Sequence, residues 1–268
     1  SQSPERPDYS TPFLPDRLKW ALARLNPSVP DEILDEAARQ LTNPPGASFE
    51  QRNRAFHRML TEGVRIDTRD ESGSLRGCTV RVLDREDPDN NDWLAVKQFS
   101  IESRQYRRRR LDAVLFVNGL PLVICEWKAP GRPLDEAWRQ LQTYRAEFPD
   151  LFALNELLIV SDGAYARMGT TTSDWEWFKA WRDPQNQSKA DTGALIKGVL
   201  DRRVLLELVS DFIVFEESHS VISKKVAGYQ QYRAVKAALR ETRRAVLGET
   251  AGERPAAGRP GDRRIGVV

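Results

Sequence analysis

The spacing of apolar residues divides the chain into a helical beginning, a central region with strand character and a helical end. Near the N-terminus, apolar residues recur every three or four positions, which predicts helices over 18–25, 30–41 and 49–62. Gly63 is expected to end the third of these helices. From Cys78 onward the period falls to two, and we expect strands at 78–83 and 93–101 that belong to one sheet.

The strongest strand signal is a pair of apolar runs, Leu111–Val117 and Leu120–Lys128, separated by Asn118-Gly119. Asn-Gly between two apolar runs favours a tight turn, so we expect a hairpin here. The same kinds of pattern predict a helix over 133–148 and a second hairpin over 157–168. Together these elements predict an α/β fold in which helices pack on a mixed sheet.

Beyond Trp181 the sequence becomes polar and then helical again. Residues 183–188 predict a loop, and apolar spacing predicts helical structure over 195–212 and 223–247. Gly, Pro and Ala make up nine of the fifteen residues 248–262, a composition typical of a flexible connector, and 265–268 resemble the start of a buried strand. We therefore expect three parts, 1–182, 183–247 and 248–268, and a chain that is a fragment of a longer protein.

Composition limits the class of protein. Two cysteines are too few for a disulfide framework, and we find neither a signal-peptide pattern nor an apolar run long enough for a membrane helix. We expect a soluble, cytoplasmic protein with no membrane partner. The 41 basic and 39 acidic residues give a net charge of +2, which by itself does not indicate a nucleic-acid partner.

The distribution of charge changes that interpretation. Five acidic residues lie in 84–92, where we expect a solvated turn rather than a calcium loop, whereas five arginines give 101–110 a net charge of +4. This basic segment directly precedes Asp112, so it is placed where a phosphate backbone could approach. We expect Arg107, Arg109 and Arg110 to contact DNA, the alternative being a solvated face. Lys224 and Lys225 are weaker candidates for the same surface.

Charged residues interrupt the apolar hairpin at one end. Glu126 and Lys128 are two positions apart, so they project from the same face of their strand. A regular two-residue turn would place Asp112 opposite Cys125 and on the other face. We therefore predict an odd-length loop or a bulge within 117–121, where Pro121 cannot donate to the ladder. A regular two-residue hairpin would contradict the site.

If these three side chains converge, they suit metal-assisted hydrolysis of a phosphodiester. The carboxylates of Asp112 and Glu126 would hold Mg²⁺, which lowers the pKa of a bound water, and Lys128 would position that water. On spacing alone, an exposed strand end with a Glu126–Lys128 ion pair is an equally good interpretation.

Residues Arg109–Lys128 resemble the nuclease core of type I restriction endonuclease R subunits, with Leu111 in place of the usual proline. The resemblance continues through Gln140-Leu141-Gln142-Thr143-Tyr144, which is similar to the QxxxY motif of the RecB-like branch of PD-(D/E)xK nucleases. It implies a PD-(D/E)xK, restriction-endonuclease-like fold whose catalytic residues are Asp112, Glu126 and Lys128. It also implies that Gln140 and Tyr144 position DNA or the active-site lysine.

The resemblance covers about residues 15–268 and extends to a motor domain. Residues 227–235 are similar to the segment of R subunits that holds the adenine-reading glutamine of a superfamily 2 helicase, and Gln231 is the matching residue. The implied organisation is an endonuclease domain with N-terminal helices at 1–182, a helical linker and start of the motor at 183–247, and a connector with the first helicase strand at 248–268. The resemblance implies that ATP would bind only in the full-length subunit, because in that family the phosphate-binding loop comes after the segment that 264–268 resemble.

The resemblance also implies an N-terminal helix that bears a further glutamate in R subunits, and we expect this fragment to lack it. Glu62 and His57 are the local substitutes to consider, although a surface carboxylate and a packing histidine are the better interpretations.

The sequence therefore favours Mg²⁺-dependent endonucleolytic cleavage of double-stranded DNA by the nuclease domain of a type I restriction-modification R subunit. The resemblance implies coupling to ATP-driven translocation, in complex with modification (methyltransferase) and specificity subunits. Two alternatives remain open. One is a stand-alone repair nuclease with the same core, and the other is a non-catalytic domain that only docks DNA or partner subunits.

Overall fold

A computed structural model of the chain describes residues 5–69, 75–103, 105, 108–183, 185 and 189–247. The chain forms two compact units, which divide between Val226 and Ala227. We call residues 1–226 the first unit and residues 227–268 the second unit. The functional limits at 182 and 247 stay predictions.

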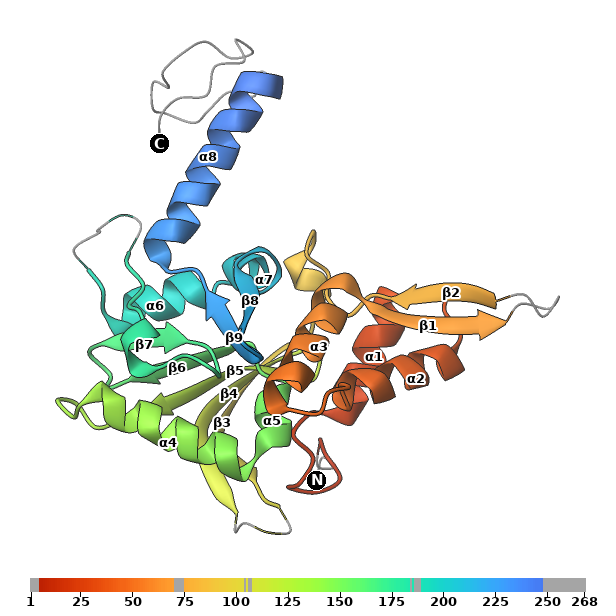
Figure 1. Cartoon of the computed structure of the whole chain (residues 1–268), viewed down its shortest axis with the longest axis horizontal. Coiled ribbons are helices and arrows are strands. Elements are labelled where there is room, and N and C mark those ends of the chain that lie inside the picture. The colour runs from red at the N-terminus through yellow and green to blue at the C-terminus, as the bar shows by residue number, and fades with distance from the viewer. Residues whose placement is uncertain are drawn as a thin grey trace. The chain divides into compact units, whose positions relative to one another are not determined.

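A five-stranded sheet forms the centre of the first unit (Figure 1). Its strands, in spatial order, are β3 (Trp93–Ile101), β4 (Arg109–Val117), β5 (Leu120–Trp127), β6 (Leu157–Ser161) and β7 (Ala166–Gly169). In this sheet β5 and β6 run parallel, and the other neighbouring pairs are antiparallel. The parallel pair needs a crossover, which contains α4 (Leu134–Glu147) and α5 (Pro149–Ala153). The predicted mixed sheet with flanking helices is confirmed.

The helices α4 and α5 pack on one face of this sheet. The core between them is formed by residues at alternate strand positions and by the apolar stripe of the helices: Val114, Phe116, Ile124, Leu158, Val160, Ala137, Leu141, Leu151 and Phe152. Since side chains alternate between faces along a strand, Asp112 and Glu126 belong to the same face as Val114 and Ile124. The candidate carboxylates therefore lie on the helix-covered side of the sheet.

Along the chain, helices come before and after the strands of the sheet, as predicted. Before it come α1 (Pro15–Leu25), α2 (Asp31–Thr42) and α3 (Phe49–Glu62), and after it come α6 (Thr192–Val199) and α7 (Arg202–Asp211). Helix α3 begins and ends where it was predicted to. Ser48 caps its start by accepting a hydrogen bond from the Gln51 amide, and Gly63 ends it with φ 88°. Short 3₁₀ turns lie at Pro88–Asn90 and Trp175–Trp177.

The prediction that strand 78–83 joins the sheet of β3 is wrong. The strand is β2 (Leu75–Val80), and it pairs with β1 (Val64–Arg69) in a separate two-stranded sheet. Figure 1 shows this ribbon extending away from the central sheet. Alternation marks a strand but does not name its partner, and here the partner is the segment that directly follows α3.

The predicted helix over 223–247 is wrong in its first residues. Residues 223–226 belong to β9 (Val221–Val226), which forms a hairpin with β8 (Ile213–Ser218), and α8 (Tyr229–Leu247) begins only in the second unit. The period of two is visible in the burial of Ile222 and Lys224, and apolar spacing alone overlooked it. Within the part of the chain that the structure describes, no helix combines the length and apolar character needed to cross a membrane.

The acidic segment 84–92 is a turn, as predicted, but it is not fully solvated. Asp84 and Asn91 are buried, and the Asp84 carboxylate accepts hydrogen bonds from the backbone amides of Glu86 and Asp87. The aspartate thus satisfies the backbone of its own turn.

Candidate active site

The β4–β5 hairpin contains the predicted irregularity. Asn118 and Gly119 form a two-residue turn with φ of 51° and 78°, so that Val117 pairs with Leu120. Two residues earlier Leu115 pairs with Val123, which means that three steps along β5 oppose two steps along β4. The extra residue lies at Pro121–Leu122 and forms a bulge, as predicted.

The bulge decides which side chains face one another. Ala113 pairs with Cys125, and the same register places Asp112 opposite Glu126. Without the extra residue, Asp112 would stand opposite Cys125 and its side chain would point to the other face. The bulge therefore brings the two carboxylates together.

The two carboxylates have different surroundings. Glu126 is only 2% exposed, whereas Asp112 is half-buried and its Oδ2 accepts a hydrogen bond of 2.8 Å from the Trp127 amide. Burial and the nearby Asp112 charge raise the pKa of Glu126 to about 7, although Lys128 acts in the opposite direction. Glu126 Oε2 is buried and has no hydrogen-bond partner among the described residues.

Lys128 completes the cluster together with two side chains from α4. Its Nζ lies 3.5 Å from Glu126 Oε1 and donates a hydrogen bond to Gln140 Oε1. Gln140 Nε2 in turn donates to the Tyr144 hydroxyl at 2.6 Å, since residues four apart on a helix are neighbours. Five predicted site residues are thus close together: Asp112, Glu126, Lys128, Gln140 and Tyr144.

The basic segment before Asp112 is only partly available to a ligand. Arg109 Nε and Nη2 each donate to the Glu147 carboxylate at 2.8 Å, in a two-pronged ion pair at the end of α4. Arg110 is exposed. Arg107 lies outside the described residues, as does Arg104. Contact between these arginines and DNA stays a prediction.

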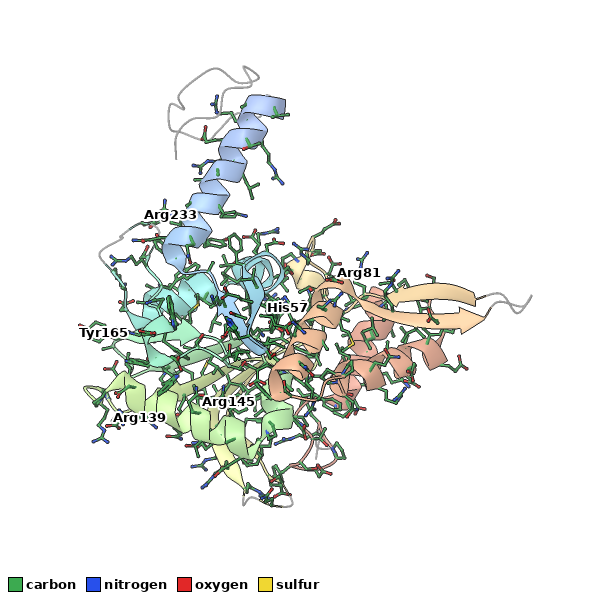
Figure 2. The ribbon with its side chains drawn as sticks, in the orientation of Figure 1. His57, Arg81, Arg139, Arg145, Tyr165 and Arg233 are labelled. Carbon is green, nitrogen blue, oxygen red and sulfur yellow. The ribbon has the colours of Figure 1, made fainter. Side chains whose placement is uncertain are left out.

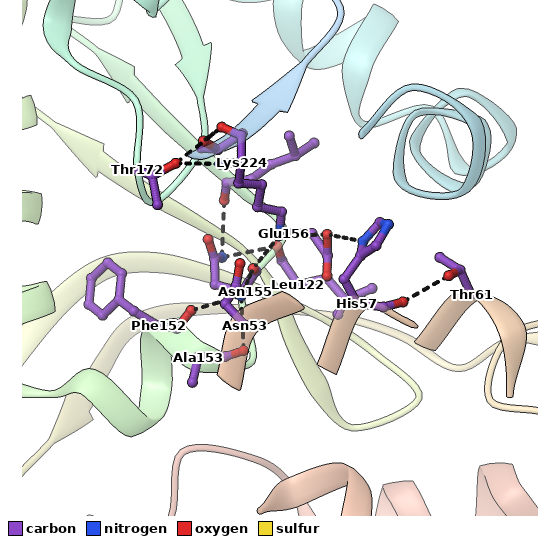
Figure 3. Close-up of polar contacts among 12 residues, drawn as sticks. Asn53, His57, Thr61, Leu122, Phe152, Ala153, Asn155, Glu156, Thr172 and Lys224 are labelled. Atoms are coloured by element: carbon purple, nitrogen blue, oxygen red, sulfur yellow. Dashed lines mark hydrogen bonds and ion pairs between the residues drawn. The ribbon is translucent and has the colours of Figure 1, made fainter. Parts of the chain in front are cut away.

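The prediction that Lys224 contributes to a basic surface is wrong. Lys224 is 1% exposed, and its Nζ lies 2.7 Å from Glu156 Oε2 (Figure 3). Its place on an inward-facing position of β9 removes it from solvent, whereas the neighbouring Lys225 is exposed and paired with Glu216. Charge counted along the sequence could not separate these two lysines, because adjacent strand residues point to opposite faces.

His57 is a packing histidine and not part of the carboxylate pair. It lies on α3 in the interior of the first unit (Figure 2), with Nδ1 2.9 Å from Glu156 Oε2. Glu62, at the end of α3, is exposed. Neither residue has an observed contact with Asp112 or Glu126.

Sequence reasoning missed Asn155 and Glu156, which are both buried just before β6. The available signal was the pair of polar residues between Leu154 and Leu157, within an otherwise apolar run. Such residues are expensive to bury unless they have partners, so they indicate a polar network in the core.

Gln231 lies at the start of α8 in the second unit. Its Oε1 accepts a hydrogen bond of 2.8 Å from the Gly228 amide, which is one of the unpaired amides at the beginning of the helix. A contact between Gln231 and adenine stays a prediction.

The residues at the end of β5 fit a divalent cation. Glu126 Oε2 is a buried acceptor that lacks a donor, and the facing Asp112 adds a second negative charge. A bound cation would satisfy both. Among the described residues there is no cluster of three or more His, Cys, Asp or Glu side chains with metal-binding geometry. The side chains would thus supply two carboxylates, as at Mg²⁺ sites that keep several waters.

Comparison with known proteins relates this site to a family. Residues 1–177 match the family described as Type I restriction enzyme R protein N terminus. The chain is 34% identical to the type I restriction enzyme HindI endonuclease subunit of Haemophilus influenzae, over 98% of this chain and 25% of that protein. It is 29% identical to the putative type I restriction enzyme MjaIXP endonuclease subunit of Methanocaldococcus jannaschii, over 98% of this chain and 26% of that protein.

A third relative is the type I restriction enzyme EcoprrI endonuclease subunit of Escherichia coli, 28% identical over 53% of this chain and 48% of that protein. The chain spans about a quarter of the length of the first two relatives. Since the family match covers most of its residues, the chain belongs to the type I restriction enzyme R protein family and contains the family's N-terminal region.

Proposed function

We propose that the first unit is a PD-(D/E)xK nuclease domain that cleaves double-stranded DNA with Mg²⁺, as the nuclease part of a type I restriction enzyme R subunit. The observation that carries this proposal is the alignment of Asp112 with Glu126 by the β5 bulge, beside Lys128. The names of the relatives, which are endonuclease subunits, agree with it.

Each residue has a role that follows from its surroundings. When bound, Mg²⁺ would polarise the scissile phosphate and lower the pKa of a water molecule. Glu126, with a pKa of about 7, would release its proton as the cation binds. Lys128 would hold the attacking water and balance developing negative charge, and Gln140 and Tyr144 would keep its ammonium group in place.

The remaining parts of the proposal concern the whole subunit. We propose that exposed Arg110 contacts the phosphate backbone and that Gln231 reads adenine in the full-length protein, where ATP hydrolysis would drive translocation. Cleavage would take place in the cytoplasm, in a complex with modification and specificity subunits.

Substitution in the full-length subunit, assembled with its partner subunits, tests the proposal. Asp112→Ala and Lys128→Ala are each expected to lower the rate of DNA cleavage at least about 100-fold, because each removes a charge from the reacting centre. DNA binding and DNA-stimulated ATP hydrolysis should be unchanged. Lys19→Ala, which removes an exposed charge from α1, is the control and should cleave normally.

Normal cleavage by both Asp112→Ala and Lys128→Ala would refute the proposal. That result would favour the alternative in which the domain only docks DNA or partner subunits.

A further inference from the structure

Two groups just before β6 support the β5 bulge: the Glu156 backbone amide, which donates to the Leu122 carbonyl at 2.8 Å, and the buried side chain of Asn155. A bulge takes backbone groups out of the ladder, and inside a protein such groups need other partners. Asn155, buried between α5 and β6, provides one (Figure 3). Its Nδ2 donates to the carbonyl oxygens of Leu122 and Leu157 at 3.0 Å each and lies 3.4 Å from that of Pro121. The Asn155 amide therefore joins the bulge to the first residue of β6.

Asn155 is itself held by two other elements. Its carbonyl oxygen accepts hydrogen bonds of 2.9 Å from Asn53 Nδ2 on α3 and from Lys224 Nζ on β9. Asn53 also donates to the carbonyl of Ala153, at the end of α5. Since Asn53, Asn155 and Lys224 are all buried, water cannot replace these bonds. The backbone at Asn155 is thus tied to α3 and to β9.

The charge of Lys224 is balanced in the interior. Its Nζ lies 2.7 Å from Glu156 Oε2, and His57 Nδ1 lies 2.9 Å from the same oxygen. Burial acts to raise the pKa of Glu156, but Lys224 and His57 outweigh it and hold that pKa below its ordinary value. Thr172 Oγ1 accepts from the Lys224 amide at 2.7 Å and fixes its backbone. Lys224 is therefore positioned to donate to Asn155.

We propose that Asn155 is a positioning residue of the nuclease site: by holding the bulge at Pro121–Leu122, it fixes the register in which Asp112 faces Glu126. Asn53 and Lys224 support the same alignment because they hold Asn155. This inference rests on the proposed function, in which the two carboxylates bind a divalent cation. A residue that only stabilised the fold would change the folded fraction and leave the cation affinity of the folded molecules unchanged.

Binding of Mn²⁺ to the 268-residue chain tests the inference without DNA or cleavage. Electron paramagnetic resonance measures free Mn²⁺ and gives the affinity of samples whose folded fraction is matched by circular dichroism. Asn155→Leu keeps the side-chain size and removes the amide, and it is expected to weaken Mn²⁺ binding roughly 10- to 100-fold, as for other residues that orient metal ligands.

The matched control is Asn26→Leu. Asn26 is also buried, and its Nδ2 donates to the carbonyls of Leu22 and Arg81 at 2.9 and 2.8 Å, so this variant loses a similar set of hydrogen bonds. Its Mn²⁺ affinity should equal that of the unsubstituted chain. Asn53→Ala is a second test variant, which is expected to weaken binding in the same direction by a smaller factor, and it decides the question if Asn155→Leu does not fold.

The outcomes separate this inference from the proposed function. Unchanged Mn²⁺ affinity in folded Asn155→Leu and Asn53→Ala, together with loss of binding in Asp112→Ala, would overturn the positioning role and leave the proposed cation site intact. Unchanged affinity in Asp112→Ala would instead overturn the proposed cation site. Weaker binding in Asn155→Leu and Asp112→Ala, but not in Asn26→Leu, is the result expected.

Discussion

Glu126 has the most unusual surroundings of the residues in the proposed site. It is buried, it faces Asp112, and its Oε2 lacks a hydrogen-bond partner among the described residues. Burial and the Asp112 charge raise its pKa from an ordinary value of 4.5 to about 7. Between about pH 4.5 and pH 7, the folded protein without a cation therefore keeps a proton on Glu126 that the unfolded chain has already released.

This difference predicts a pH-dependent stability. From about pH 4.5 to pH 7 the folded state binds more protons than the unfolded state, so the free energy of unfolding falls as the pH rises, and the loss is complete above about pH 7. The pKa difference corresponds to about 3 kcal/mol. Glu126→Gln cannot ionise, so it should be more stable than the unsubstituted protein by about that amount at pH 8 without divalent cations.

Urea unfolding at pH 5 and pH 8 in a chelator measures this effect. Glu62→Gln, at an exposed carboxylate of α3, is the control and should show the same pH dependence as the unsubstituted protein. If Glu126→Gln also showed that dependence, Glu126 would not be the titrating group.

At the scale of secondary-structure elements, the Asn118-Gly119 turn shows how local preference and packing act together. Gly119 has φ 78°, and its carbonyl accepts a hydrogen bond of 2.9 Å from the Leu14 amide. A Cβ at Gly119 would lie 2.6 Å from Leu14 O and 2.7 Å from Leu18 N. The hairpin therefore depends on glycine both for its backbone conformation and for contact with the start of α1.

Gly119→Ala is expected to lower the free energy of unfolding by at least about 3 kcal/mol, because strain from a positive φ adds to the clash with α1. Gly163→Ala is the matched control, since Gly163 has φ 88° and nothing within 4 Å of its would-be Cβ. That control should lose only about 1–2 kcal/mol. Denaturant unfolding measures the free energy of unfolding of both variants. Equal losses of stability in Gly119→Ala and Gly163→Ala would show that packing against α1 does not restrict the turn.

At the scale of the first unit, the buried ion pair between Lys224 and Glu156 joins segments that are distant in the sequence. Glu156 precedes β6, Lys224 belongs to β9, and His57 reaches the same carboxylate from α3. A buried ion pair contributes little net stability compared with apolar residues of similar volume, yet a lone charge at the same place is very costly.

Lys224→Met is accordingly expected to lower the free energy of unfolding by about 3–5 kcal/mol, because it removes the ammonium group from the buried Glu156 carboxylate and leaves it only the contact with His57. The double variant Glu156→Gln with Lys224→Met removes both charges and should recover most of that loss. Lys225→Met breaks an exposed pair with Glu216 and should change stability by less than about 1 kcal/mol. Urea unfolding at neutral pH measures these free energies. A double variant as unstable as Lys224→Met would show that the buried Glu156 charge is not the cause of the loss.

Much of the proposed site could be predicted from the sequence, because the patterns that indicate it lie within short stretches of the chain. Asn118-Gly119 predicted the turn, and counting positions from that turn showed that Asp112 and Glu126 could meet only through an irregularity near Pro121. The four-residue spacing of Gln140 and Tyr144 predicted that they would be neighbours on one helix.

Contacts between distant segments could not be predicted in this way. No feature of the neighbouring sequence distinguishes the buried Lys224 from the exposed Lys225. Nor does any such feature show that Glu147 would form an ion pair with the guanidinium of Arg109. The pairing of β2 with β1 was likewise missed, since alternation indicates a strand without indicating its neighbour.

The sequence by itself determined most of the helices, the central hairpin and the set of charged residues at its end, because propensity, turn chemistry and side-chain alternation act over a few residues. The tertiary structure alone decided that Asn155, Asn53 and Lys224 meet at the β5 bulge and that Glu126 becomes a buried carboxylate with a raised pKa. Burial and hydrogen bonding between residues about a hundred positions apart, as for Asn53 and Asn155, depend on how the elements pack, which no short stretch of the sequence encodes.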